Sequence, residues 1–236
     1  MHYWNRKNFE GLRGLSSELS SIPELNGLAE YCNLREKGLR TDALQALHKF
    51  IQEAIGRDVN AKRRIVLDIL SADARTPEAH QFLTHPILTQ LLFPTLEEWL
   101  SESPAAFEPL RWLGLMKSDF AHLEAALSAE PSDVPVRRRL IGIELDNVDY
   151  ATHHLDESIL LSPLDECRSS LFRVGQLLDG YMPSKWFESL AEEYKEYVSM
   201  LDDWELFNQS EYNDFPEWCR ANDRHYRWPT KVYYDG

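Results

Sequence analysis

Apolar residues recur every three or four positions along most of the chain, which is the spacing of one face of an α-helix. The recurrence is clearest in three groups: Leu44, Leu47, Phe50 and Ile51; Val148, Ala151, Leu155 and Ile159; and Leu171, Val174 and Leu178. No stretch alternates apolar and polar residues over six positions with β-branched enrichment, as a half-buried strand would. The pattern therefore predicts an all-α protein.

Prolines divide this helical pattern into short pieces. Proline lacks a backbone N–H and clashes with the preceding turn, so it marks the ends of helices. The prolines between residues 77 and 183 stand at positions 77, 86, 94, 104, 109, 131, 135, 163 and 183. We therefore expect many helices of about 10 to 15 residues joined by short loops.

Three segments share one arrangement of small, bulky and turn residues. In the first, a helix ends near Leu34, the chain turns at Gly38, and a second helix places Ala43, Leu47 and Phe50 inward. The segment after Trp112-Leu113-Gly114 has Ala121, Ala125 and Ser128 at the same offsets and closes at Pro131. The last turns at Asp146-Asn147, continues with Ala151, Leu155 and Ser158, and closes at Pro163.

This arrangement resembles the tetratricopeptide repeat, a helix-turn-helix unit of about 34 residues. The chain departs from the family pattern at Ile55, which stands where proline is expected, and over residues 60–105, which show no clear copy. The resemblance covers about half of the chain and implies stacked antiparallel helical hairpins, an α-solenoid. We assign residues 1–27 to an N-terminal extension and residues 28–180 to the helical-repeat domain; some other α-helical bundle is the alternative.

Residues 181–236 have a different character and form the third predicted segment. Residues 186–207 are amphipathic and predict one long helix. An aromatic-rich stretch without helical period follows, and contains Tyr212, Phe215, Trp218, Tyr226, Trp228, Tyr233 and Tyr234. We expect this irregular tail to pack on the last helices as a cap, because a repeat array needs a terminal cap. The alternative is that it lines a groove for a partner.

Charge narrows the possible partners. The 236 residues include 39 acidic and 25 basic ones, a formal net charge of −14. Nucleic acids and anionic membranes attract proteins of the opposite sign, so neither is expected as a partner. Residues 140–180 contain 8 acidic and 2 basic residues, and residues 181–236 contain 12 and 6. The acidity is thus a property of the C-terminal part, where we expect any cationic partner to bind.

Cysteine usage and hydropathy indicate the compartment. Cys32, Cys167 and Cys219 are far apart and form no CxxC pair, so neither a zinc site nor a disulfide framework is indicated. The first residues contain no apolar stretch typical of a signal peptide, and no run approaches the roughly 18 apolar residues of a membrane span. We expect a cytoplasmic protein with free, buried thiols and no membrane contact.

Arginines supply the candidate binding residues. In tetratricopeptide proteins the first helix of each hairpin lines a concave groove, and the resemblance places five arginines on such helices. Their guanidinium groups can clamp carboxylates of a peptide, and one tryptophan can serve as an apolar anchor. The predicted partner-binding residues are Arg111, Trp112, Arg138, Arg139, Arg168 and Arg173.

One cluster has the composition of a metal site. Asp149, His153 and Glu157 are spaced by four residues on a predicted helix, so they share a face. Imidazole and carboxylate can hold a transition metal, but a complete site needs ligands from another helix. A solvated polar face is the simpler interpretation. We identify no catalytic residues and expect no cofactor.

These observations favour a non-enzymatic protein-interaction module that binds another protein or peptide. One alternative is an immunity or antitoxin-like protein, in which an acidic surface neutralises a basic toxin. The other is a metal-dependent enzyme on a helical scaffold, for which the His153 cluster is the single candidate site.

Overall fold

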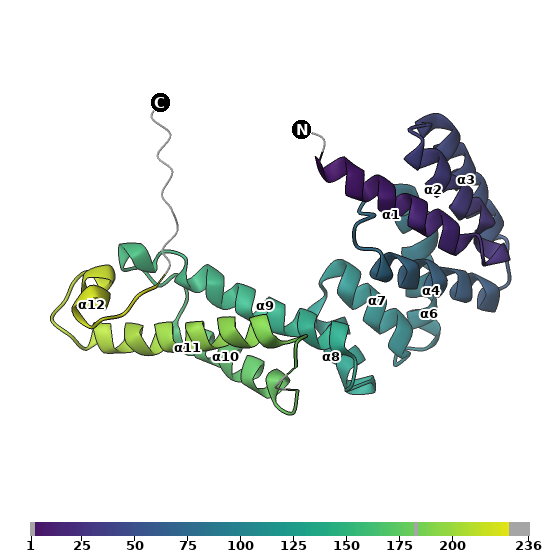
Figure 1. The fold of residues 1–236 in the computed structure, drawn as a ribbon. Coiled ribbons are helices and arrows are strands. Elements are labelled where there is room, and N and C mark those ends of the chain that lie inside the picture. Colours follow the sequence, from purple (N-terminus) through teal and green to yellow (C-terminus); the bar gives the residue numbers. More distant parts are fainter. Residues whose placement is uncertain (1–2, 182–183, 227–236) are drawn as a thin grey trace. The chain divides into compact units, whose positions relative to one another are not determined.

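The computed structural model describes residues 3–181 and 184–226, and every regular element in that part is helical (Figure 1). The all-α prediction is confirmed there. The chain divides into two compact units, Met1–Ala129 (unit 1) and Glu130–Gly236 (unit 2). The division falls inside the segment assigned to the repeat domain. In the described part, no helix is both long enough and apolar enough to cross a membrane.

Unit 1 consists of helices of 3 to 17 residues. They are α1 (Tyr3–Leu19), η1 (Pro23–Leu25), α2 (Asn26–Glu36), α3 (Arg40–Ile55), α4 (Val59–Arg75), α5 (His85–Ile87), the π-turn η2 (Leu88–Leu92), α6 (Phe93–Glu102), α7 (Phe107–Lys117) and α8 (Phe120–Ala129). Helix α2 packs against α1 and α3, and α7 packs against α8. One apolar core joins helices α1 to α7 and includes Tyr31, Leu47 and Phe82.

The first predicted hairpin has the expected form. Helices α2 and α3 are separated by a turn in which Gly38 adopts φ +75°, a conformation that glycine reaches without strain. Ala43, Leu47 and Phe50 are all buried on α3, as their spacing predicts.

The register predicted for the second hairpin is wrong. Helices α7 and α8 meet at a turn, but Ala121, Ala125 and Ser128 are exposed on α8. The buried residues are Leu123, Ala126 and Leu127, because Leu123 is the residue that faces Gly114. A Cβ at Gly114 would lie 3.0 Å from Leu123, so the absence of a side chain on α7 is what allows the close approach.

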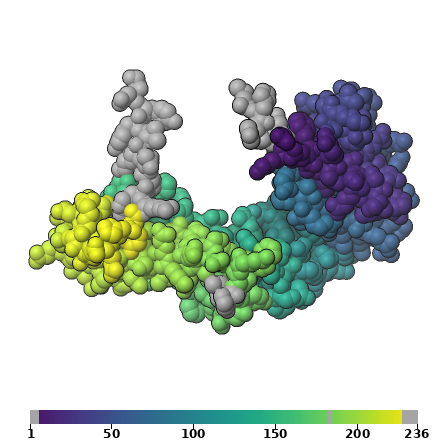
Figure 2. Space-filling model, viewed as in Figure 1, coloured from purple at the N-terminus to yellow at the C-terminus, as the bar shows by residue number. Residues whose placement is uncertain are grey.

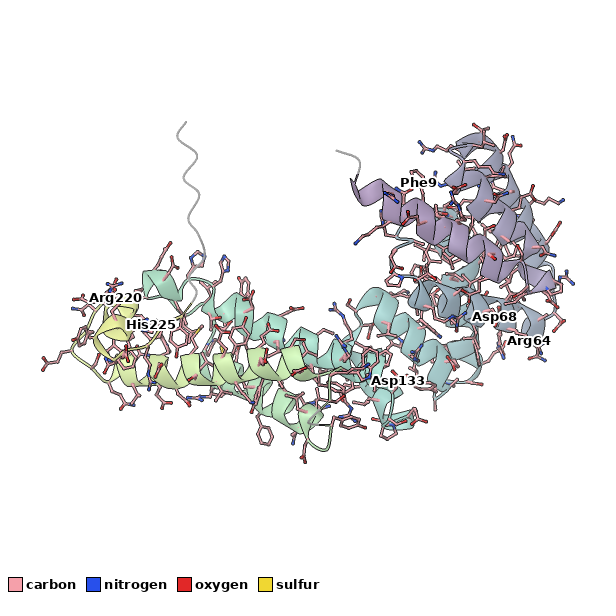
Figure 3. All side chains as sticks on the ribbon, in the orientation of Figure 1. Phe9, Arg64, Asp68, Asp133, Arg220 and His225 are labelled. Carbon is pink, nitrogen blue, oxygen red and sulfur yellow. The ribbon has the colours of Figure 1, made fainter. Side chains whose placement is uncertain are left out.

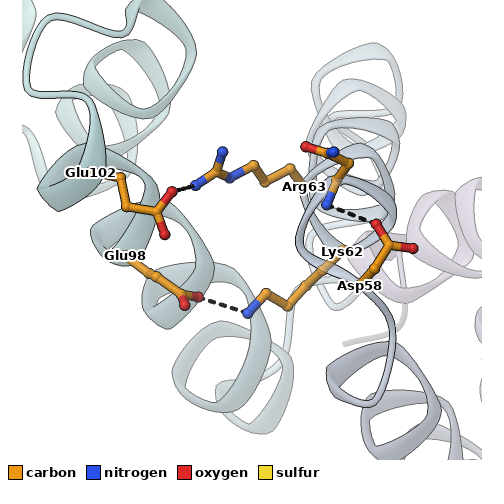
Figure 4. A network of polar contacts seen from close by, with 6 residues as sticks. Asp58, Lys62, Arg63, Glu98 and Glu102 are labelled. Atoms are coloured by element: carbon orange, nitrogen blue, oxygen red, sulfur yellow. Dashed lines mark hydrogen bonds and ion pairs between the residues drawn. The ribbon is translucent and has the colours of Figure 1, made fainter.

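Two ion pairs join α4 to α6 on the surface of unit 1 (Figure 4). Lys62 Nζ lies 2.7 Å from a carboxylate oxygen of Glu98, and Arg63 pairs with Glu102 one turn further along α6. The Arg63 guanidinium also covers the Trp99 ring at 4.9 Å. Asp58 caps α4 by accepting a hydrogen bond from the backbone N–H of Asn60 at 3.0 Å.

Unit 2 has fewer and longer helices. They are α9 (Val134–Thr152), η3 (Leu155–Glu157), α10 (Leu164–Leu178), α11 (Glu188–Asn208) and α12 (Phe215–Ala221). Helix α10 packs against both α9 and α11. Asp133, labelled in Figure 3, caps the start of α9 by accepting a hydrogen bond from the N–H of Val136 at 2.8 Å. The long helix predicted for residues 186–207 is confirmed as α11.

The turn predicted at Asp146-Asn147 is wrong. Helix α9 runs through both residues without interruption, because Leu145 and Val148 on either side are buried in its packed face. The helix ends at Thr152, and Leu155, which was expected to be inside a second helix, lies in the short η3. Ser158 follows with φ 60°, so the third predicted hairpin does not form as a helix-turn-helix.

The aromatic residues after α11 pack back onto the unit. Phe215 and Trp218 on α12 join Leu155, Trp204 and Phe207 in a second apolar cluster. The Phe215 and Trp204 rings meet edge to face with centroids 5.2 Å apart, a favourable arrangement for aromatic pairs. Trp228, Tyr233 and Tyr234 lie outside the described residues.

Candidate protein-binding surface

A groove lies between α10 and α11 on unit 2. Its volume is about 660 Å³, and its lining residues are Phe172, Gly175, Gln176, Leu178, Asp179, Gly180, Ala191, Tyr194 and Lys195. Because Gly175 has no side chain, Tyr194 of α11 can approach α10 closely: a Cβ at Gly175 would lie 3.1 Å from Tyr194 Oη. The surface of both helices is the green part of Figure 2.

Phe172 is the apolar residue that stands out at this groove. Helix α10 buries Cys167, Leu171 and Val174 on its inner face. Phe172, one position past Leu171, is turned away from that face and is 69% exposed. It is the most exposed large hydrophobic side chain in the described part of the chain. An aromatic ring at the rim of an apolar groove is a typical anchor point of a protein interface.

The part of α11 that lines the groove is rich in carboxylates. Ala191, Tyr194 and Lys195 line the groove, and the exposed Glu192, Glu193 and Glu196 are their neighbours in sequence. Unit 2 as a whole has 22 acidic and 11 basic residues, a formal net charge of −11. A cationic partner would be attracted over a range of about 8 Å at physiological ionic strength.

The carboxylates repel one another where α11 faces α9. Partial burial of the carboxyl group raises the pKa of the otherwise exposed Glu193, and the neighbouring charges of Asp149, Asp146 and Glu196 raise it further. Tyr197 donates a hydrogen bond to Asp149 at 2.8 Å, and burial, together with this bond and the nearby charges, raises the pKa of Tyr197. A positive charge brought to this face would relieve the repulsion.

The arginines predicted to bind a partner have different environments. Arg111 and Trp112 belong to unit 1, where the guanidinium covers the indole ring at 4.3 Å. The Trp112 side chain is 8% exposed and donates its indole N–H to Glu108 at 3.1 Å. Trp112 is therefore part of the unit 1 core.

Arg168 on α10 is engaged by two carboxylates of α11. It lies 2.5 Å from Asp202 and 3.1 Å from Glu205. Burial lowers the pKa of Arg168, but the hydrogen bonds and charges of the two carboxylates outweigh it, so the pKa is raised. This arginine fastens α10 to α11. Arg173, on the same helix, is half-buried and also interacts with other groups.

The three consecutive arginines of α9 differ in their roles. Arg137 is buried and donates to the carbonyls of Leu177 at 2.9 Å and Pro131 at 2.8 Å. Its guanidinium also lies 3.9 Å from the Tyr181 ring centroid, so it is a structural residue that the sequence pattern did not single out. Arg139 is half-buried and interacts with other groups. Arg138 lies in a separate pocket with Trp186.

The candidate metal ligands are rearranged by the end of α9. His153 and Glu157 are not one turn apart on a single helix as predicted, because α9 ends at Thr152. Asp149 accepts a hydrogen bond from Tyr197. Instead, ligand atoms of His154, Asp156 and Glu157 lie within 4.8 Å of one another. Nitrogen and carboxylate ligands of this kind suit a divalent transition metal. All three come from one turn, and Asp156 and Glu157 also interact with other groups.

The three thiols are buried, as expected from their isolation. Burial raises the pKa of Cys32 to about 12 and the pKa of Cys219 to about 11, with the charge of Asp203 adding to the second. Thiolates are therefore scarce at neutral pH, which argues against nucleophilic cysteine chemistry.

No known protein family, curated protein or solved structure matches the chain.

Proposed function

We propose that the protein is a non-enzymatic interaction module whose unit 2 binds a cationic segment of another protein. The observation that carries the proposal is the exposed Phe172 beside an apolar groove, in a unit with a net charge of −11. The expected ligand is an amphipathic helix with apolar residues on one face and lysine or arginine on the other. The apolar face would enter the groove, and the basic residues would meet the carboxylates of α11.

We also propose that the scaffold is built from helical repeats of the tetratricopeptide type. The support is the α2–α3 hairpin, with its glycine turn and its inward Ala43, Leu47 and Phe50. Helices α7 and α8 add a second compact pair around Gly114.

A designed basic amphipathic peptide of leucine and lysine tests the charge requirement. We expect saturable one-to-one binding to the full chain, measured by fluorescence anisotropy, that weakens as salt is raised from 50 to 500 mM. A peptide of the same helical pattern with glutamate in place of lysine is the matched control and is expected not to bind. Equal binding of the two peptides, or no effect of salt, would exclude a cationic partner.

Filling the groove tests its role independently of charge. Gly175→Leu places a branched side chain between α10 and Tyr194 without changing the net charge. We expect the affinity for the basic peptide to fall at least tenfold. Because leucine is a better helix former than glycine, helicity and thermal unfolding should show that the variant is folded. Unchanged affinity in a folded Gly175→Leu protein would remove the groove from the proposal.

A further inference from the structure

A second pocket lies at the start of α9, in unit 2. Its volume is about 550 Å³, within the range of roughly 300–1,000 Å³ that is usual for small-ligand sites. Among the described residues, it is lined by Val134, Pro135, Arg138 and Trp186, three of which are apolar. The first three residues lie within one turn of α9 and share a face.

Trp186, from the segment before α11, also lines the pocket. It is 54% exposed and precedes Phe187, which is 1% exposed. Phe187 N–H donates to the carbonyl of Ser184 at 2.9 Å, and its ring packs on Tyr181 with centroids 5.7 Å apart. The turn that carries Trp186 is therefore anchored in the core through Phe187.

Arg138 is the polar group of this pocket. It is half-buried and, within the part of the chain that the structure describes, it makes no hydrogen bond or ion pair. This is unexpected for an arginine in a unit with 22 acidic residues. Arg137, Arg139, Arg168 and Arg173 all interact with other groups. Among the described residues that line the pocket, Arg138 is therefore the cation that an anionic ligand can pair with.

We infer that this pocket binds a small monocarboxylate with an apolar body. A guanidinium group matches a carboxylate in a bidentate geometry, and the indole and proline rings offer flat apolar contact to an aliphatic or aromatic group. The Lys185 ammonium lies 5.1 Å from the centroid of the Trp186 ring, so a second cation beside the pocket adds to the attraction for a carboxylate. Polyanions such as nucleic acids are disfavoured by the net charge of −11.

The inference is independent of the proposed groove, because the two sites share no lining residue. Arg138→Gln is therefore expected to leave binding of the basic peptide unchanged or to strengthen it. Phe172→Ala is expected to leave carboxylate binding unchanged. Failure of either proposal can thus be distinguished from failure of the other.

The test uses 3-phenylpropionate as the probe and 3-phenylpropanamide as its neutral analogue. Binding to the full chain is followed by the indole ¹H–¹⁵N resonance of Trp186, assigned by its loss in Trp186→Phe. We expect a saturable shift of this resonance with the acid. The amide lacks the negative charge that a guanidinium group pairs with, so it should bind at least about tenfold more weakly.

Arg220→Gln is the matched control, since Arg220 is an exposed arginine of the same unit outside the pocket, labelled on α12 in Figure 3. We expect Arg138→Gln to weaken binding of the acid about tenfold or more and Arg220→Gln to have no effect. Equal binding of acid and amide would overturn the inference. Equal effects of Arg138→Gln and Arg220→Gln would also overturn it. Binding of a phenylalanine-terminated peptide without binding of 3-phenylpropionate would overturn it as well.

Discussion

The hydroxyl of Tyr226 donates a hydrogen bond to the carboxylate of Asp203, which is almost completely buried on the inner face of α11. Arg224 Nε lies 3.2 Å from the same carboxylate oxygen. Two residues of the segment after α12 thus hold one buried acid. This contact fixes the described end of the chain over the aromatic cluster of Phe215 and Trp218.

Removal of the Tyr226 hydroxyl should destabilise unit 2. Tyr226→Phe leaves a buried carboxylate with one donor fewer, so we expect the free energy of unfolding to fall by about 1–3 kcal/mol. Urea unfolding followed by tryptophan fluorescence measures this, because Trp204 and Trp218 lie in the affected cluster. Tyr212→Phe, at an exposed tyrosine of the same unit, is the control. If the two variants unfold at the same urea concentration, the hydrogen bond does not stabilise the unit.

Alkaline pH should destabilise the fold through Cys219. Its pKa is raised from the ordinary 9.0 to about 11 by burial and by the charge of Asp203. Between these values the unfolded thiol loses its proton while the folded thiol keeps it, so the free energy of unfolding falls as pH rises. Between pH 9 and 11, we expect the free energy of unfolding of the unsubstituted protein to fall by about 1.4 kcal/mol per pH unit more than that of Cys219→Ala. An identical slope in the variant would show that the thiol does not titrate in this way.

Two glycines inside helices should respond in opposite directions to alanine. A Cβ at Gly114 would lie 3.0 Å from the backbone nitrogen and side chain of Leu123, whereas a Cβ at Gly142 meets nothing within 4 Å. We expect Gly114→Ala to lower the stability of unit 1 by about 1–3 kcal/mol through overpacking. Gly142→Ala should raise the stability of unit 2 by up to about 1 kcal/mol, because alanine is the better helix former.

Calorimetry of the two glycine variants provides the check. Each alanine should shift the thermal transition of the unit that contains it, downward for Gly114→Ala and upward for Gly142→Ala. A stabilising Gly114→Ala would mean that α7 and α8 do not approach each other as described.

Hydrophobic periodicity predicted the helices well where one face is buried and glycine or proline marks the boundary. Gly38 and the spacing of Ala43, Leu47 and Phe50 are examples. It failed at Asp146-Asn147, because these polar residues were interpreted as a turn although the buried Leu145 and Val148 keep α9 intact. The apolar contacts there outweigh the modest preference of Asp and Asn for turns.

The binding residues were harder to predict, because each depends on contacts distant in sequence. The arginine run contains Arg137, which is buried and bonded to the Leu177 carbonyl, and Arg138, which has no polar partner among the described residues and lies beside Trp186. The run itself does not distinguish these two environments. The hydrophobic pattern of the sequence did not single out Phe172, because its exposure follows from the packing of its neighbours. The concentration of acidic residues in the C-terminal part was visible from the sequence alone.

The most direct test of the central claim compares two exposed phenylalanines of the chain. Phe172 is 69% exposed at the groove of unit 2, and Phe120 is 42% exposed at the start of α8 in unit 1. The measurement is the dissociation constant of the basic amphipathic peptide for Phe172→Ala and for Phe120→Ala at equal salt. We predict at least tenfold weaker binding for Phe172→Ala and unchanged binding for Phe120→Ala. Equal dissociation constants for both variants would contradict the assignment of the α10–α11 groove as the binding surface.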